Sequence, residues 1–400
     1  MHILFLSRWF PYPPNNGSKL RIYNLLRGLA KHHQVTLLTF SDQTHTPEEV
    51  RELRSFCEAV EVIPLKTFDP KSWRAQLGFL STKPRSVIDT YSQSMEQAIE
   101  RIVSRKQVDL IIASQIDMAI YGNAFHGLPA LFEEVEVGVI YEQFVKANSF
   151  KHRMRSGLTW TKHRRYLATL LRNFHVCTVV SRREQQLLRE EVHLNTPIEV
   201  IPNCVDTADY AGFNQTPAPN SLIFTGSFSY YPNYEAMNWF LGEVYPLVQA
   251  AVPEVNLSIT GNHGNRPLPP ATNVELTGFV DDVRPLIKSA WASIVPLHTG
   301  GGTRLKILEA MALRTPVIAT SKGAEGLDVR ANEHLLIADT PAEFTQATIR
   351  LMKDQELRQF LSNNAYQLVA RQYDWNIIIP RFLELIERTV QVNTLSYSHH

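Results

Sequence analysis

The sequence predicts two doubly wound α/β domains that face each other across a cleft. Short apolar runs alternate with amphipathic helical segments along the chain, and the layout of the first forty residues returns from residue 221. A length of 400 residues is enough for two or three domains. Ligands of such sheets bind beyond the carboxyl ends of the strands, so we expect a ligand in the cleft between the domains.

The first half begins with a strand, a loop, a helix and a second strand. The apolar run 3–7 leads into the aromatic–Pro–Asn loop 9–17, a helix capped by Ser18 that runs to about Lys31, and a strand over 35–40. This spacing is typical of a βαβ unit in a parallel sheet. Further strands are expected at 108–113, 128–132 and 176–181.

The second half repeats this layout. A strand over 221–226 is followed by the aromatic–Pro–Asn loop 230–233, a helix over 235–248 and a strand over 255–260. The polar, Pro-containing stretch 206–220 is expected to be a linker between the domains. Later strands are expected at 291–296, 317–320 and 334–337, and helices at about 342–352 and 355–371.

Composition excludes several classes of protein. Lys and Arg number 40 against 39 Asp and Glu, so the chain lacks the basic excess of a general nucleic-acid binder. Three distant cysteines form neither a disulfide framework nor a Cys-rich zinc site, and a reducing, cytoplasmic compartment is expected. The short apolar run at the N-terminus lacks the basic leader of a signal peptide, and no apolar stretch is long enough to span a membrane.

The most informative segment is a glycine loop before a predicted helix. Glycines 300–302 follow the strand 291–296, and the helix is expected to start at Thr303. Glycines let backbone N–H groups approach a ligand closely, and a helix N-terminus attracts anions. Arg304 and Lys306 are expected in the first turn, where cations oppose the helix dipole.

This placement of cations indicates an anionic ligand such as a diphosphate. Glu309 shares a helix face with Lys306 and can accept hydroxyl hydrogen bonds one turn deeper. Because a Lys before a Glu is the weaker orientation of a helical ion pair, helix stability alone does not explain the pair. On these residues alone, a solvated helix start capped by glycine remains the open alternative.

The same segment and several others resemble glycosyltransferase family 4, the glycosyl transferases group 1. Their order and spacing extend over nearly the whole chain. The resembling pieces are the loop from Pro11 to Gly17, Val-Val-Ser at 179–181, Val-Ile-Pro-Asn-Cys-Val-Asp at 200–206, Phe-Thr-Gly-Ser at 224–227 with Pro232-Asn233, Gly-Gly-Thr-Arg-Leu-Lys-Ile-Leu-Glu-Ala-Met-Ala at 301–312, Thr-Pro-Val-Ile-Ala-Thr at 315–320 and Gly-Ala-Glu-Gly-Leu at 323–327.

The resemblance implies the GT-B fold, with two Rossmann-like domains. Residues 1–205 would be the acceptor-side domain, 206–375 the nucleotide-sugar-binding domain, and 376–400 a helix that crosses back to the N-domain, plus a tail. The implied enzyme is a retaining, metal-independent glycosyltransferase without a cofactor, and the chain indeed lacks any Asp-x-Asp metal motif. It would move a sugar from a nucleotide-diphosphate sugar to a glycan or lipid-linked acceptor in cell-envelope or exopolysaccharide synthesis.

Two other functions stay open beside this one. A sugar-nucleotide epimerase can use the same fold, and a non-catalytic sugar-nucleotide-binding partner is raised by one departure from the family pattern. Gly301 stands where the family has the first of two glutamates, the one that normally touches the donor sugar.

The resemblance also assigns roles to individual residues. Glu309 matches the glutamate that binds the donor's ribose hydroxyls, and Gly17 matches a loop glycine near the leaving phosphate. The family's basic pair after Gly226 is absent, and we expect Arg304 and Lys306 to supply that charge and act in catalysis. The complete predicted donor site is Gly17, Gly226, Gly302, Thr303, Arg304, Leu305, Lys306 and Glu309.

On the acceptor side, the resemblance implies a polar residue after the strand ending near Ala113. Ser114, Gln115 and Asp117 are the candidates, and Asp117 is carried forward as the catalytic one. The glutamates that follow the next strand are expected to form a surface acidic loop, with acceptor contact as the alternative. These are Glu133, Glu134 and Glu136.

Residues 146–172 carry many cations and no acidic residue. A basic helical stretch with interleaved aromatics indicates peripheral contact with an anionic membrane at its inner face, or with a lipid-phosphate acceptor. A solvated basic face is the alternative. The cations are Lys146, Lys151, Arg153, Arg155, Lys162, Arg164, Arg165 and Arg172, and the apolar residues Trp160, Tyr166, Leu167, Leu170 and Leu171.

Overall fold

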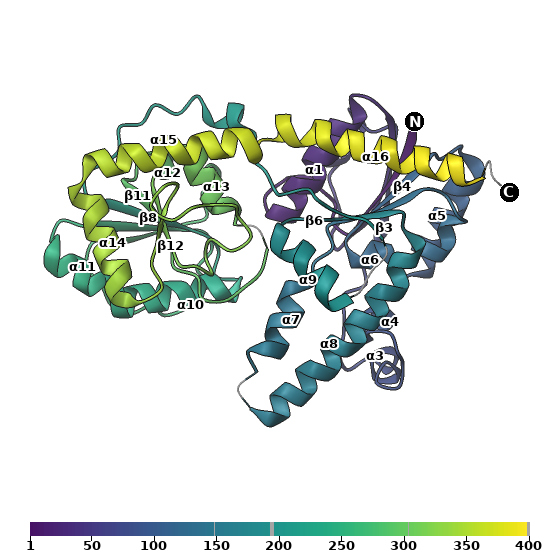
Figure 1. The fold of residues 1–400 in the computed structure, drawn as a ribbon, viewed down its shortest axis with the longest axis horizontal. Coiled ribbons are helices and arrows are strands. Elements are labelled where there is room, and N and C mark those ends of the chain that lie inside the picture. The colour runs from purple at the N-terminus through teal and green to yellow at the C-terminus, as the bar shows by residue number, and fades with distance from the viewer. Residues whose placement is uncertain (148, 193–195, 303, 398–400) are drawn as a thin grey trace. The chain divides into compact units, whose positions relative to one another are not determined.

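The computed structural model describes residues 1–147, 149–192, 196–302 and 304–397, which form two compact units. One unit comprises Met1–Pro202 together with the chain from Ile379 onward, and the other comprises Asn203–Ile378. Each unit contains one parallel sheet with helices packed on it, as Figure 1 shows. The predicted class of two doubly wound α/β domains is therefore confirmed.

The sheet of the first unit has seven strands in the order β3-β2-β1-β4-β5-β6-β7. β1 lies between β2 and β4 and pairs in parallel with both, so the chain leaves β1 in one direction and later returns on its other side. Such a reversal of strand order is where doubly wound sheets bind ligands. The strands are β1 His2–Ser7, β2 Gln34–Ser41, β3 Ala59–Pro64, β4 Leu110–Ser114, β5 Ala130–Glu133, β6 Val176–Val179 and β7 Ile198–Val200.

The helices of this unit cover the sheet. Helix α1 (Gly17–Ala30) buries leucines at helical spacing, and its N-cap is Asn16, whose side chain accepts the Lys19 N–H, rather than the predicted Ser18. The remaining elements are α2 Pro47–Arg54, α3 Trp73–Leu77, α4 Arg85–Thr90, α5 Gln93–Arg105, α6 Ile116–Ala119, η1 Gly122–Phe125, α7 Gly138–Val145, α8 Phe150–Leu170, η2 Leu171–Asn173 and α9 Arg182–Val192.

Helix α16 (Trp375–Tyr397) belongs to the first unit from its fifth residue, Ile379, onward, and Ile379 contacts α1. Gly28 of α1 allows the approach, because a Cβ there would lie 2.5 Å from the Cδ1 atom of Ile379. Figure 1 shows α16, in yellow, crossing near α1 and continuing to the C-terminus.

Helix α8 corrects one interpretation of the basic segment 146–172. The apolar residues interleaved with its cations face the core and are not available to a membrane. Trp160 is 3% exposed and contacts Tyr141 edge-on, with ring centroids 5.2 Å apart. Tyr166, Leu167, Leu170 and Leu171 are buried in the same core. The exposed face of α8 carries other side chains, treated below.

The second unit has a six-stranded parallel sheet in the order β10-β9-β8-β11-β12-β13. Its central strands are buried throughout, as expected for a sheet covered on both faces. The strands are β8 Ser221–Thr225, β9 Asn256–Thr260, β10 Val274–Gly278, β11 Ala292–Val295, β12 Val317–Ala319 and β13 Leu336–Ile337.

The helix predicted over 235–248 is longer and interrupted. Pro232 occupies the first turn of α10 (Tyr231–Trp239), so the predicted aromatic–Pro–Asn loop is the start of this helix. A π turn, η4 (Phe240–Val244), precedes α11 (Tyr245–Ala251), where Pro246 lacks the N–H of a regular helix. The other helices are η3 Thr207–Tyr210, α12 Arg284–Lys288, α13 Leu305–Ala312, α14 Pro341–Lys353 and α15 Gln355–Gln372.

Candidate functional site

The glycine loop lies at the carboxyl end of β11 in the second unit. Helix α13 begins at Leu305, not at the predicted Thr303, which is outside the described residues. Arg304 is the N-cap residue and therefore precedes the first turn. Gly300 and Gly302 adopt positive φ angles of 96° and 80°, which favour glycine over any residue with a side chain.

Arg304 holds the glycine loop together. Its guanidinium donates hydrogen bonds to the carbonyl oxygens of Gly301 at 2.6 Å and Gly300 at 2.8 Å. The side chain is buried, and its Nε–H is without a hydrogen-bond partner among the described residues. Arg304 therefore shapes the loop directly, and we assign it a positioning role.

The ammonium group of Lys306 lies beside the Asn233 side chain and the Phe224 ring. Its Nζ donates to the Asn233 side-chain oxygen at 2.9 Å and lies 4.2 Å from the centre of the Phe224 ring. Burial and the nearby charge of Arg304 together lower the pKa of Lys306 to about 7, against the opposing effect of Glu309. Near neutral pH this lysine is thus balanced between its charged and neutral forms.

Lys306 also reaches the loop that follows β8. A Cβ built on Gly226 would lie 2.9 Å from the Lys306 Nζ and 2.6 Å from the Asn233 amide nitrogen. Asn233 in turn donates to the Ser227 carbonyl at 2.8 Å. The structure therefore brings the predicted residues Gly226 and Lys306 together, at the place where the family's basic pair is missing.

Glu309 lies one turn further along α13 than Lys306. The Tyr210 hydroxyl donates to its carboxylate over a long 3.4 Å, and no cation forms an ion pair with it in the described part of the chain. Burial raises the pKa of Glu309 to about 7, while Tyr210 and Lys306 lower it. A carboxylate held so loosely has acceptor capacity left for a ligand.

The glycines of the loop differ in their surroundings. At Gly300 a Cβ would lie 2.3 Å from the Tyr230 hydroxyl, so this ring lies close to the loop. At Gly302 nothing lies within 4 Å, and the residue is exposed. Leu305, the neighbouring predicted residue, packs partly buried against the core beneath. The open side of the loop is thus at Gly302.

Three residues of this site were missed by sequence reasoning as ligand-site members. They are Asn233, Tyr210 and Tyr230. Only Asn233 had a signal, since Pro232-Asn233 belongs to the resembling segment. Tyr230 belongs to the aromatic–Pro–Asn segment 230–233 but was not predicted to reach the ligand site, and Tyr210 lies in the predicted linker, where no local pattern marks it.

The acidic residues of the first unit are placed differently from the prediction. Glu133 ends β5 and is fully buried, so it is not part of a surface loop. Its carboxylate pairs with Arg21 at 2.6 Å and accepts the Ser114 hydroxyl at 2.7 Å. A buried carboxylate needs such partners, and the hydroxyl of the candidate Ser114 is engaged with Glu133 inside the core. Glu136 alone of the three glutamates is exposed.

Gln115 and Glu134 form a second polar pair, at the ends of the adjacent strands β4 and β5. Both have positive φ angles, 68° and 60°, which non-glycine residues adopt rarely and which aim their side chains away from the strands. The Gln115 amide donates to the Glu134 carboxylate at 2.9 Å. Burial and the charge of Glu133 raise the pKa of Glu134 to about 7.

Asp117 lies in the first turn of α6 and forms an ion pair with Arg8 at 2.6 Å. Both side chains remain partly exposed, at 25% and 36%. Gly17 is the first residue of α1. The structure thus places the first-unit candidates around the carboxyl ends of β1, β4 and β5.

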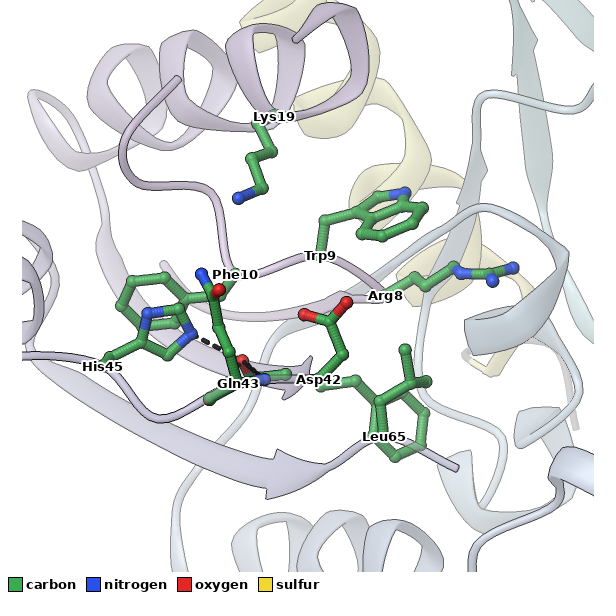
Figure 2. Close-up of a pocket in the computed structure, with 10 residues that line it drawn as sticks. Arg8, Trp9, Phe10, Lys19, Asp42, Gln43, His45 and Leu65 are labelled. Carbon is green, nitrogen blue, oxygen red and sulfur yellow. Dashed lines mark hydrogen bonds between the residues drawn. The ribbon is translucent and has the colours of Figure 1, made fainter. Parts of the chain in front are cut away.

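A small pocket lies at the carboxyl ends of β1 and β2 (Figure 2). Lys19 extends from α1 toward the space beside Asp42, and Arg8 and Trp9 line the other side. Packing and hydrogen bonds fix the position of His45 in the pocket wall. Its ring stacks on Phe10 with centroids 3.5 Å apart and forms hydrogen bonds with Ser41 and Glu49. Sequence reasoning did not single out this pocket.

The described residues contain no group of three or more His, Cys, Asp or Glu side chains that could hold a metal ion. Within the same residues, no helix is long and apolar enough to cross a membrane.

Comparison with known proteins follows the division of the chain. Residues 15–209 match the family described as Glycosyltransferase Family 4, and residues 219–354 match Glycosyl transferases group 1. The chain belongs to the group 1 glycosyltransferases of family 4. Together the two matches leave only the ends and a short junction uncovered.

Solved structures share the whole fold of this glycosyltransferase. Sucrose-phosphate synthase from Thermosynechococcus elongatus superposes with a TM-score of 0.70 at 16% identity, covering 98% of this chain and 100% of that one. Anabaena HepE, solved in complex with UDP and glucose, gives a TM-score of 0.64 at 15% identity, covering 97% and 100%. The GT-B fold is confirmed.

Sequence relatives match over shorter segments. An uncharacterized 44.6 kDa protein in the cps region of Klebsiella pneumoniae is 26% identical over 170 residues, 38% of this chain and 42% of that protein. The matched segment thus spans less than half of the relative.

Proposed function

We propose that the protein is a retaining, metal-independent glycosyltransferase that needs no cofactor. It transfers a sugar from a nucleotide-diphosphate sugar to a glycan or lipid-linked acceptor in cell-envelope or exopolysaccharide synthesis, on the cytoplasmic side. The observation that carries the proposal is Lys306, a half-buried cation without a carboxylate partner among the described residues, beside two glycine-containing loops.

Lys306 provides the charge for a diphosphate. An anion placed beside it favours the ammonium form, which burial alone disfavours, so binding raises its pKa. Negative charge on the leaving diphosphate grows as the sugar departs, and a fixed cation then stabilises the transition state more than the ground state. Backbone N–H groups around Gly302 would complete the cradle, with Arg304 fixing the loop.

Glu309 is proposed to bind the ribose hydroxyls of the nucleotide. An ionised carboxylate can accept two hydroxyl hydrogen bonds, and charge-assisted bonds of this kind are stronger than neutral ones. Its one contact with Tyr210 is long, which leaves both oxygens available. UDP is the nucleotide we test first, because HepE was solved with UDP and with UDP-glucose.

The acceptor side is proposed to lie at the strand ends of residues 1–205. Asp117 and the Gln115–Glu134 pair are half-buried polar groups at these strand ends. In a retaining transfer of this type, the departing diphosphate oxygen takes the acceptor's proton on the same face. The protein's contribution is then to position the acceptor hydroxyl, which hydrogen bonds from these residues can do.

Two experiments separate this proposal from its alternatives. The first is a thermal-shift screen with UDP-, GDP- and ADP-sugars, since a ligand that binds only the folded protein raises its stability by mass action. The second follows nucleotide diphosphate release with and without a panel of glycan acceptors, in excess EDTA.

Acceptor-dependent release in EDTA is the result we expect. An epimerase would convert the sugar nucleotide without an acceptor and without releasing the nucleotide. A non-catalytic binding partner would show a thermal shift and no turnover with any acceptor. Either result would overturn the proposed activity while leaving the fold assignment intact.

A further inference from the structure

Large apolar side chains are exposed on two neighbouring elements of the first unit. On α8, Phe150, Met154 and Leu158 are 80%, 62% and 63% exposed. On α3 and the loop after it, exposed fractions reach 72% for Trp73 and 91% for Leu80. Leu77 and Phe79 are also exposed there. We call these seven residues the apolar ridge.

The α8 part of the ridge is a stripe. Its three members are four residues apart and therefore share one helix face, away from the side that buries Trp160. Lys151 and Arg155 flank the stripe, one position along from Phe150 and Met154. Both cations are exposed, and neither forms an ion pair within the described chain.

The α3 part of the ridge is held in place from below. Lys162 of α8 donates to the carbonyls of Gly78 at 3.2 Å and Phe79 at 3.1 Å, which ties this loop to α8. Arg85 donates to the Ala75 carbonyl at 2.9 Å, and its guanidinium carbon lies 3.9 Å from the centre of the Phe79 ring. Figure 1 shows α3 and α4 beside α8.

The two segments that carry the ridge are basic. Residues 70–88 contain Lys71, Arg74, Lys83 and Arg85 and no Asp or Glu. Residues 146–172 contain eight Lys and Arg and no Asp or Glu. Two segments far apart in sequence thus form one surface on which exposed apolar side chains stand among cations.

We infer that the apolar ridge, with Lys151, Arg153 and Arg155 beside it, docks the protein on an anionic lipid bilayer. A bilayer surface offers both partners that this surface needs: an acyl boundary for the apolar side chains and phosphate-bearing headgroups for the cations. The inference does not depend on the proposed transfer reaction, although a lipid-linked acceptor would be reached from such a position.

A second copy of the chain fits this surface less well. A symmetric dimer would place the same patch against itself and bring Lys151, Arg153 and Arg155 next to the same cations of the other copy. This charge repulsion favours an anionic bilayer over self-association.

The test is cosedimentation of the full chain with vesicles of phosphatidylcholine alone or mixed with phosphatidylglycerol, at low and high salt. We expect binding to the anionic vesicles only, weakened by salt. Phe150→Ser with Leu80→Ser should lower the partition coefficient at least tenfold, because each removes apolar area from the acyl boundary. Arg153→Ser with Arg155→Ser should lower it about 25-fold, roughly fivefold for each cation.

Matched controls come from the second unit. Phe279→Ser changes a side chain that is 73% exposed, and Arg350→Ser removes an exposed cation. Both should bind vesicles like the wild type. Circular dichroism melting checks that the ridge variants fold, and donor binding measured without lipid should be unchanged in them.

Three results would overturn the inference. The first is equal binding to neutral and anionic vesicles, or none at low salt. The second is ridge variants that sediment with anionic vesicles like the wild type. The third is a dimer by light scattering that the ridge substitutions dissociate while vesicle binding is absent, which would show that the ridge is an interface between copies. Loss of donor turnover without loss of sedimentation would count only against the proposed function.

Discussion

Replacing Lys306 by methionine tests the proposed diphosphate site most sharply. Methionine keeps most of the apolar stem of the side chain and removes the ammonium that lies over the Phe224 ring, so the variant loses the charge with little change in volume. If Lys306 holds the diphosphate, turnover should fall about 10²-fold or more, on the scale of a lost oxyanion donor. The Michaelis constant should change less, because the diphosphate charge grows toward the transition state.

The pKa of Lys306 gives a second and independent readout. Because this pKa is about 7 in the empty protein, most molecules carry a neutral lysine at pH 8.5. A diphosphate that binds the ammonium form must then take up a proton, and its affinity should fall about tenfold for each pH unit above 7. Inorganic diphosphate is the suitable probe, since it lacks a ribose and so does not engage Glu309.

Calorimetric titration with inorganic diphosphate at pH 8.5, in buffers of different ionisation enthalpy, counts this proton. Wild type should take up close to one proton per diphosphate, and Lys306→Met none. Binding without proton uptake in wild type would refute the assignment, as would wild-type-like turnover in the variant.

The pH dependence of the folding stability should also reflect the titration of Lys306. The pKa of Lys306 is lowered on folding from 10.5 to about 7, so between these pH values the unfolded chain binds more protons than the folded one. Its contribution to stability therefore rises with pH through this window. The melting temperature of wild type relative to Lys306→Met should rise between pH 7 and pH 10. A difference in melting temperature that stays constant between pH 7 and pH 10 would show that the pKa of Lys306 is not lowered on folding.

Three further predictions concern carboxylates. Glu309→Gln should weaken nucleotide diphosphate binding by about 1.5–3 kcal/mol, the contribution of a hydrogen bond to a charged group, and should leave inorganic diphosphate binding nearly unchanged. Equal effects on both ligands in calorimetry would place Glu309 outside the ribose site. Glu133→Gln breaks the buried pair with Arg21 and should cost about 3–5 kcal/mol in urea unfolding, so a variant as stable as wild type would contradict the structural role. Glu134→Gln should unfold like wild type and should change the pH profile of kcat/KM near pH 7 without flattening it, because Lys306 and Glu309 also titrate there. A profile identical to that of wild type would show that Glu134 does not contribute to it.

Much of the fold could be predicted because central strands of parallel sheets are continuous apolar runs. Strands β1, β2, β4, β8 and β11 are buried along nearly their whole length and were all anticipated. Strands β3 and β10 are at sheet edges, where exposed and half-buried residues break the apolar run. They carry a weaker signal and were missed.

The predicted helix boundaries were less accurate than the predicted strands. The start of α13 was predicted two residues early, because the glycine loop continues to Arg304 and that residue turns back to bind the loop carbonyls. A side chain that bonds its own preceding turn leaves no periodic pattern to detect. The interruption of α10 and α11 at Pro246 follows from proline chemistry and could have been anticipated.

The candidate site was predictable where chemistry lies in one segment. The segment 300–309 contains the glycines, the two cations and the glutamate of the predicted site, and its described members lie near one another in the structure. Burial was not predictable in the same way. Glu133 looks like its neighbours in an acidic run, yet it is fully buried because Arg21, 112 positions away, meets it. Likewise, the apolar residues of α8 that seemed available to a membrane fill the core instead.

The central claim is that this chain transfers a sugar from a nucleotide diphosphate with retention and without a metal. The most direct measurement is NMR of the slow hydrolysis of nucleotide-diphosphate α-glucose, with UDP, GDP and ADP as the nucleotide, in excess EDTA, so that water serves as the acceptor. We predict that α-glucose appears first, with one equivalent of free nucleotide diphosphate, before mutarotation mixes the anomers. Initial release of β-glucose or a requirement for a divalent metal would contradict the account.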